Sequence, residues 1–256
     1  MNKIAINQDA CIGCGQCVKD CPGACISLSS GKAGIIENSF CIECGHCYAV
    51  CPANAIRMEG FSCEEKPVTP MTVLDSGTLL SAMKSRRTMR QFKDQPVEAE
   101  KILRILEAGR YSPTGGNSQS VEFTILGSRQ EEAEKICVNL FRTGQKAGSV
   151  VTELLKRMDI SDHFFFKGAP LVIVVSAKNQ TDGALASSYM EIMAESLGLG
   201  VLYSGFFIAC TALSRKLRRL LALPKGRKAV TCMVIGYPAV TYQRIVPRKP
   251  ANVRIL

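Results

Sequence analysis

Eight of the thirteen cysteines in this 256-residue chain fall in two copies of one pattern, and the second copy begins 30 residues after the first. Each copy reads Cys-x2-Cys-x2-Cys-x3-Cys-Pro. Three thiolates within seven residues can hold three corners of an iron-sulfur cube, and the fourth, before proline, can supply the last corner of the other cube. The pattern predicts two [4Fe-4S] clusters, one held by Cys11, Cys14, Cys17 and Cys51, and the other by Cys41, Cys44, Cys47 and Cys21.

Other uses of these cysteines fit less well. A zinc ribbon is typically built from separated Cys-x2-Cys pairs, and disulfides need no repeated spacing that ends in proline. The repeat also continues past the ligands, because Cys-Pro-x3-Ile occurs at both 21–26 and 51–56. We therefore expect two similar half-domains about a pseudo-twofold axis. Residues 1–60 resemble a bacterial-type two-cluster ferredoxin, with short strands near Ala5-Ile6 and Ile35-Ile36.

The remainder of the chain is long enough to bury a core of its own. Residues 61–74 contain two prolines and no apolar period, which predicts a linker, and residues 75–256 then form the second domain. Its apolar patterning indicates an α+β fold without the Gly-x-Gly-x-x-Gly sequence of a dinucleotide-binding domain. We expect helices near 77–88, 97–110, 130–140, 182–197 and 203–221, and strands near 121–126, 170–177 and 229–236.

Four stretches of the second domain could bind a flat anionic ligand. Arginines and a hydroxyl cluster at 86–90, and a loop of glycine and small polar residues occupies 112–119. Such side chains suit a phosphate, and glycine lets a backbone approach a ring closely. The third stretch is 197–206, and the fourth comprises 236–239 and 247–249. Taken singly, each stretch is equally compatible with a solvated helix end or an ordinary turn.

In this order and spacing, the four stretches resemble the FMN-dependent nitroreductase family over essentially all of residues 75–256. The resemblance implies helices around a mainly antiparallel sheet, with FMN at the interface of a homodimer. Many members have Pro-Trp after the glutamine of the loop, where this chain has Ser120-Val121, so the substrate pocket should differ. By resemblance, Arg86, Thr88 and Arg248 bind the FMN phosphate, with Arg87 nearby, and Arg90 lies at the N1/O2 edge of the flavin. The resemblance also implies that the chain passes near flavin N5 at Tyr203, Ser204 and Gly205. The residues that it implies contact the ring from the partner subunit are Pro113, Thr114, Gly115, Asn117 and Gln119.

A flavin beside two clusters can convert one-electron transfers into two-electron chemistry. We therefore expect a flavin-dependent oxidoreductase that takes electrons from reduced ferredoxin or a similar donor and passes them to a small planar acceptor, such as a nitroaromatic or a quinone. Two alternatives remain open: an NAD(P)H-dependent enzyme whose clusters export electrons, and a non-catalytic electron carrier or redox sensor. No protein side chain is predicted to act as a catalytic acid, base or nucleophile, because neither His46 nor His163 is well placed for this.

The formal charge of +10 could suggest a nucleic-acid partner. Each of the two clusters and the flavin phosphate would, however, add a charge of about −2, so bound anions offset much of the excess positive charge. The longest charge-free run, 196–214, contains three glycines and fits a buried helix and turn better than a membrane span. The amino terminus has no signal pattern, and thiolate ligands require a reducing compartment. We expect no nucleic-acid or membrane partner and a cytoplasmic location.

Overall fold

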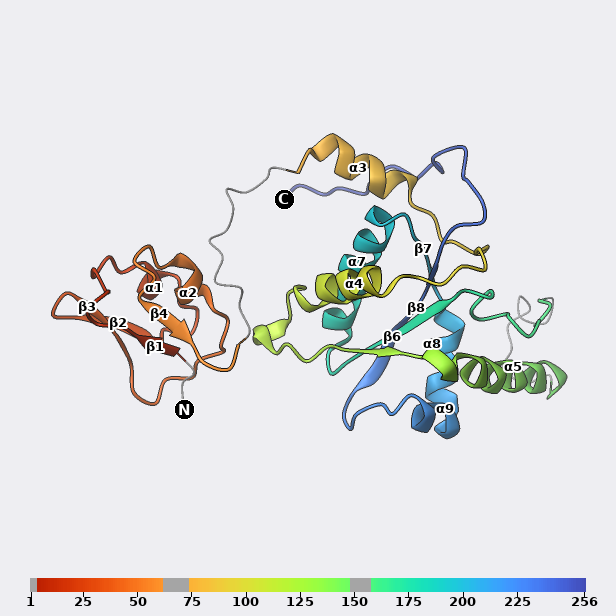
Figure 1. Cartoon of the computed structure of the whole chain (residues 1–256), viewed down its shortest axis with the longest axis horizontal. Helices are drawn as coiled ribbons and strands as arrows, with labels where there is room; N and C mark the ends of the chain where they lie inside the picture. The colour runs from red at the N-terminus through yellow and green to blue at the C-terminus, as the bar shows by residue number, and fades with distance from the viewer. Residues whose placement is uncertain (1–3, 62–73, 148–157) are drawn as a thin grey trace. The chain divides into compact units, whose positions relative to one another are not determined.

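The computed structural model describes residues 4–61, 74–147 and 158–256 (Figure 1). The chain divides into two compact units, the first comprising Met1–Thr72 and Gly116–Ser118, and the second Val73–Gly115 and Gln119–Leu256. The predicted linker at 61–74 lies almost wholly outside the described residues. The boundaries predicted for the two domains therefore stay a prediction.

The first unit is built from two similar halves. In each half a cysteine loop runs into a short helix that begins after a left-handed glycine, Gly15 (φ 73°) or Gly45 (φ 75°). Glycine adopts this conformation without the steric cost of a Cβ atom. Two antiparallel strand pairs complete the unit, β1 with β4 and β2 with β3. The elements are β1 (Ile4–Ile6), α1 (Gln16–Lys19), β2 (Ile26–Ser29), β3 (Lys32–Ile35), α2 (His46–Val50) and β4 (Ile56–Met58).

The second unit contains a four-stranded sheet in the order β5-β6-β8-β7, with every neighbouring pair antiparallel. All seven residues of β6 are buried, as its continuous apolar sequence predicted. This sheet confirms the predicted α+β class with a mainly antiparallel sheet. The strands are β5 (Glu122–Ile125), β6 (Leu171–Ala177), β7 (Gly200–Tyr203) and β8 (Lys228–Gly236).

Helices cover both faces of this sheet (Figure 1). Alternate residues of β6 enter different cores: Ile173 packs with Ile105 and Met190 on one face, whereas Val174 packs on the other face with Phe207. This follows from the two-residue period of a strand. The first face is covered by α4 (Ala99–Arg110) and α7 (Gln180–Ser196), and the second by α5 (Gln130–Ala147), α8 (Gly205–Leu213) and α9 (Arg215–Leu220).

The prediction of one helix at 203–221 is wrong. Strand β7 ends at Tyr203, and Ser214 interrupts the helical segment with extended dihedral angles (φ −110°, ψ 112°). The Ser214 hydroxyl accepts the N–H of Leu217 at 3.1 Å and so begins α9 as a separate helix. Strands β2 and β4 were also missed, and α3 (Ser76–Ser85) ends three residues before the predicted 88. Within the described residues, no helix has the length and apolar character needed to cross a membrane.

Candidate functional site

The eight pattern cysteines of the first unit lie in two separate pockets. The fourth cysteine of each sequence motif lies with the three cysteines of the other motif, and the assignment of each group to a cluster stays a prediction. Cys51 thus joins the first three cysteines, and Cys21 joins the second three. One pocket is lined by Cys11, Cys14, Cys17 and Cys51, and the other by Cys21, Cys41, Cys44 and Cys47.

The surroundings of these sulfur atoms suit thiolate ligands. Backbone N–H groups donate to Cys21 Sγ (3.2 Å) and Cys51 Sγ (3.3 Å) at matching places in the repeat. The N–H of Ala33 donates to Cys11 Sγ (3.4 Å), and this hydrogen bond lowers the pKa of Cys11. Such donors stabilise sulfur that carries negative charge. Burial, by contrast, raises the pKa of Cys47 to about 11. The Cys47 thiolate would therefore need a cation bound to it.

Four cysteines in each pocket fit a cubic cluster rather than a single metal ion. Among the described residues, no group of three or more His, Cys, Asp or Glu side chains converges on one metal-ion position. A [4Fe-4S] cube is held at four separate iron atoms, so its ligands need not converge on one point. The donor set and the N–H donors around it therefore fit this cofactor.

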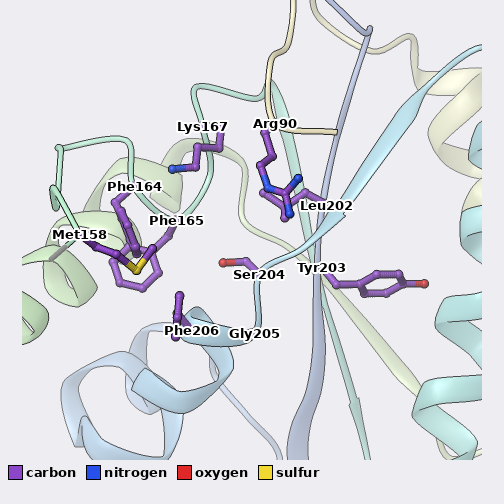
Figure 2. Close-up of a pocket in the computed structure, with 10 residues that line it drawn as sticks. All are labelled: Arg90, Met158, Phe164, Phe165, Lys167, Leu202, Tyr203, Ser204, Gly205 and Phe206. Carbon is purple, nitrogen blue, oxygen red and sulfur yellow. The ribbon is translucent and has the colours of Figure 1, made fainter. Parts of the chain in front are cut away.

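The second unit contains a cavity of about 440 Å³ between three chain segments (Figure 2). One wall is the end of β7 and the start of α8. Another comes from the segment that follows α3, and the third from the segment that precedes β6. The lining residues are Arg90, Met158, Phe164, Phe165, Lys167, Leu202, Tyr203, Ser204, Gly205 and Phe206.

Backbone pairing beside β7 fixes the position of Arg90. The N–H of Met89 donates to the carbonyl of Val201 at 2.9 Å. The chain from Met89 to Lys93 then crosses to the end of β8, where the N–H of Lys93 donates to the backbone carbonyl of Tyr237 at 2.8 Å. A Cβ atom on Gly200 would lie 2.8 Å from Met89 Cβ, so this approach requires glycine. Because Met89 is buried and adjacent residues of an extended chain face opposite ways, Arg90 is directed into the cavity (Figure 2).

The opposite wall offers backbone hydrogen-bond donors. Ser204 is tied to the sheet, since its N–H donates to the carbonyl of Cys232 at 2.8 Å, and α8 begins at Gly205. The first N–H groups of a helix have no partner within it and can bind acceptor atoms of a ligand. Tyr203 contributes mainly backbone, because its ring points away from the cavity (Figure 2) and its hydroxyl donates to the Ser187 carbonyl at 2.9 Å.

Arg86 is engaged by a buried carboxylate rather than directed into this cavity. Arg86 Nη1 lies 2.8 Å from Glu191 Oε1, with the side chains 28% and 11% exposed. Burial raises the pKa of Glu191, and the Arg86 charge opposes that rise. The neighbouring Arg87 donates to the carbonyl of Arg86 at 2.7 Å, but its Nε and Nη2 atoms are buried and have no partner among the described residues. A bound anion would satisfy them.

Comparison with known families decides what kind of protein carries this cavity. Residues 83–237 match the family model described as "Nitroreductase family". The chain belongs to the nitroreductase family. Residues 4–58 match a second model, described as "4Fe-4S dicluster domain", so the prediction of a ferredoxin domain followed by a nitroreductase domain is confirmed.

Individual nitroreductase-like proteins are only distantly similar. A Bacillus subtilis protein named "FMN reductase [NAD(P)H]" is 27% identical over 173 residues, which is 63% of this chain and 66% of that protein. The crystal structure of a nitroreductase with bound FMN from Desulfitobacterium hafniense has a TM-score of 0.57 at 22% identity and covers 69% of this chain and 98% of its own. For the FMN-bound nitroreductase from Bacteroides fragilis, the TM-score is 0.56 at 21% identity, with coverages of 70% and 98%. These two structures show the fold.

Within the nitroreductase unit, the predicted flavin-site residues do not all gather in one place. Arg90, Tyr203, Ser204 and Gly205 line the cavity. Arg86, Arg87 and Thr88 lie on the segment that leads to Arg90, where Thr88 bridges to Val201. The other predicted residues lie outside the cavity lining. Asn117 groups with the first unit, and Arg248 lies in the exposed C-terminal segment. The remaining ones are Pro113, Thr114, Gly115 and Gln119.

For the wall that precedes β6, the sequence left residues 164–166 open between core packing and a lid over the flavin, and it did not single out Met158 or Lys167. Phe164 and Phe165 line the cavity, whereas Phe166 packs in the core at 5.0 Å from the Phe207 ring centroid. Buried Glu134 of α5 holds this turn by accepting the N–H groups of Phe165 (2.9 Å) and Phe166 (2.7 Å). The run of three phenylalanines was the available signal, but periodicity alone could not separate core from cavity wall.

The buried Arg86–Glu191 pair leads to a prediction about the stability of the cofactor-free protein. Replacing Arg86 with alanine leaves Glu191 as an uncompensated buried carboxylate, so Arg86→Ala should lower the free energy of unfolding by about 3 kcal/mol at pH 7.5. The folded-state pKa of Glu191 would rise further above its unfolded value, and the folded state would then favour the protonated acid. The loss should therefore shrink as the pH falls toward about 5, in urea unfolding followed by circular dichroism.

Two further variants test the cause of that loss. Glu191→Gln in the Arg86→Ala background should recover most of the lost stability, because no buried charge remains. Arg104→Ala removes an arginine from an exposed pair with Glu100 on α4, with side chains 60% and 76% exposed, and should change little. Equal losses in Arg86→Ala and Arg104→Ala would contradict the assignment.

Proposed function

We propose that this protein is an FMN-dependent oxidoreductase that collects single electrons through two [4Fe-4S] clusters and delivers them in pairs to a small planar acceptor, such as a nitroaromatic or a quinone. The observation that carries the proposal is that one chain holds two four-cysteine pockets and the Arg90 cavity of a nitroreductase unit. The FMN-bound nitroreductases of the same fold support the choice of flavin. Thiolate ligation of iron-sulfur clusters points to the reducing cytoplasm.

The chain's own residues suit the two ends of FMN. Arg90 would face the N1/O2 edge, and the backbone of Ser204 and Gly205 would lie near N5. The phosphate would go to the 86–88 segment, where two buried nitrogen atoms of Arg87 lack a partner among the described residues. FMN, when bound, supplies both one-electron exchange and hydride transfer from N5.

A homodimer would complete the site. Leu185, Tyr189 and Ile192 form an exposed apolar stripe on α7, and Leu103 of α4 is 65% exposed. Exposed apolar stripes of this kind are typical of subunit interfaces. Six predicted flavin-site residues lie outside the cavity lining in the single chain, and in such a dimer they would serve the flavin of the partner subunit: Pro113, Thr114, Gly115, Asn117, Gln119 and Arg248.

Two contacts stiffen the loop that would reach the partner's flavin. The N–H of Gly115 donates to the buried carboxylate of Asp182 at 3.0 Å, and the N–H of Gln119 donates to the Thr114 hydroxyl at 3.0 Å. Gln119 also has a positive φ of 44°, a conformation that ordinary residues seldom adopt. A loop held in this way suits a contact with a rigid ring.

The cavity provides charge stabilisation rather than proton transfer. None of the described lining residues is an aspartate, glutamate or histidine. Reducing a nitro group to a nitroso group takes two electrons and two protons and releases water. With no acid on the described walls, the protons would come from solvent, and Arg90 would offset the negative charge of the reduced ring.

A second candidate is an NAD(P)H-dependent enzyme whose clusters export electrons. The observation in its favour is the name of the Bacillus subtilis relative, "FMN reductase [NAD(P)H]". That match covers 63% of this chain, and the name of the relative does not explain why the cysteine pockets are present. We therefore favour electrons that enter through the clusters.

Anaerobic titration of the purified protein separates these candidates. Reduced ferredoxin should bleach the cluster and flavin absorbance together, whereas NADPH alone should leave both nearly unchanged. Fast reduction of the flavin by NADPH, followed by the clusters, would favour the second candidate. Absence of a flavin band, with no binding of added FMN, would contradict both.

A further inference from the structure

The cavity has a wall that the proposed flavin contacts do not use. Met158, Phe164, Phe165 and Lys167 come from the segment before β6, and Figure 2 shows the two phenylalanines and Met158 on the side away from Arg90, with Lys167 extending toward Phe164. None of these four residues belongs to the stretches that suggested a flavin. This wall is therefore available to the second reactant, the electron acceptor.

Lys167, which lines the cavity, is held in an unusual backbone conformation. Its φ is 54°, in the left-handed region, and its N–H donates to the His163 carbonyl at 2.9 Å. Residues other than glycine, asparagine and aspartate rarely adopt this conformation, and such strain is found most often at functional sites. The turn thus fixes where the Lys167 side chain begins.

An aromatic platform supports the ammonium group. Lys167 Nζ lies 4.7 Å from the centroid of the Phe164 ring, within the range of a cation–π contact. The Phe164 ring is 7% exposed and packs edge-on against Phe165, with the centroids 5.1 Å apart. Because both rings are buried, the ammonium group sits over a rigid apolar surface at the cavity.

The charges around the cavity are all positive. Arg90 and Lys167 are the charged members of the described lining, which includes no carboxylate. The proposed function assigns Arg90 to the reduced flavin. Lys167 is left with an aromatic surface beside it, and that combination complements a flat ring carrying an anionic group.

We propose that the acceptor is a planar aromatic anion, with a carboxylate or phenolate bound by Lys167 and its ring packed against the phenylalanine wall. The proposal rests on the proposed function, since the flavin must occupy the Arg90 side. Lys167 acts as a specificity-determining residue: it binds the anionic group and takes no part in electron or proton transfer.

The test compares an anion with its neutral isostere in the oxidised, flavin-loaded protein. Benzoate and benzamide are titrated separately, and binding is read from the perturbation of the flavin absorbance. Benzoate should bind about tenfold more tightly, the size expected of one charge-assisted contact, and the preference should weaken with added salt. Lys167→Gln should abolish the preference, and Lys167→Arg should keep it.

Matched controls and turnover complete the experiment. Lys225→Gln removes an exposed lysine between α9 and β8, outside the cavity lining, and should leave the preference intact. With reduced protein, Lys167→Gln should raise KM about tenfold for 4-nitrobenzoate, with little change in kcat and no change for 4-nitrobenzamide. Flavin content and melting temperature verify that each variant is folded.

The outcomes separate this inference from the proposed function. If flavin binds and 4-nitrobenzamide is reduced, but wild type shows no preference for benzoate or Lys167→Gln preserves one, the inference fails and the proposed function stands. If the protein binds no flavin, both fail.

Discussion

A Cys11→Ala/Cys51→Ala double variant should retain about four iron atoms per chain, whereas Cys11→Ala/Cys21→Ala should retain almost none. In the structure Cys11 and Cys51 share one pocket, while Cys21 lines the other. The first variant therefore damages a single site twice, and the second variant damages both sites. If each motif held its own cluster, the two results would be reversed, because Cys11 and Cys21 belong to the same motif.

The measurement is iron and sulfide content after anaerobic purification, with electron paramagnetic resonance of the reduced protein to identify the surviving cluster. Flavin content is the internal control, because the flavin cavity lies in the other compact unit and should be loaded equally in both variants. Cys137→Ala supplies a matched cysteine replacement in the second unit, where Cys137 is buried among apolar side chains, and should leave about eight iron atoms. Equal iron loss in the two double variants would contradict the exchanged assignment.

The grouping of the cysteines in the first unit could be predicted because the sequence pattern is itself the pattern of the expected ligands. Ligand spacing is fixed by the geometry of the cube, so the two cysteine groups follow directly from the motif. The short strands β2 and β4 were harder to predict, since a unit with little core has weak hydrophobic periodicity. Cys25 lines the pocket that contains Cys21, and Ala55 lines the pocket that contains Cys51. The two residues occupy matching positions in the Cys-Pro-x3-Ile repeat, so the repeat itself indicated that their places are equivalent.

In the second unit, long periodic elements were predictable and their junctions were not. Strand β6 was evident from its apolar run, but β7 was not predicted: residues 200–202 were assigned to no element, and Tyr203 was placed at the start of a helix. That strand is defined by tertiary pairing: β8 lies on one side, and the Thr88–Met89 segment pairs on the other. Such partners lie far away in the sequence, so local propensity could not reveal them.

The same reasoning explains which flavin-site residues came together. Arg90 and Ser204 are far apart in sequence, yet both are placed by β7, one beside it and one at its end. The resemblance singled out both residues, and their contact with FMN stays a prediction. Lys167 depends on a left-handed turn, and the buried Arg86–Glu191 pair depends on the packing of α7. Neither feature has a local sequence signature, so both had to be found in the structure.

Replacing Arg90 with alanine should make the flavin harder to reduce. Arg90 is the cationic side chain directed into the cavity from the segment beside β7, and we propose that it faces the flavin edge where reduction places negative charge (Figure 2). Loss of one positioned donor from such a site typically costs about 10²-fold in rate. We expect Arg90→Ala to shift the flavin midpoint potential to a more negative value and to slow flavin reduction by about that factor, while the cluster potentials stay the same.

Potential measurements distinguish this electrostatic role from a merely structural one. Arg90→Lys keeps a positive charge and should restore most of the midpoint potential and rate, although without the fixed fork of the guanidinium group. Arg110→Ala removes an arginine whose partner is Glu107 on the same helix, outside the cavity lining, and should leave the flavin unchanged. Spectroelectrochemical titration gives the potentials, and rapid mixing with reduced ferredoxin gives the rates. If Arg90→Ala binds FMN with an unaltered potential, then Arg90 does not stabilise the reduced ring, and the positive charge in the cavity must serve another anion.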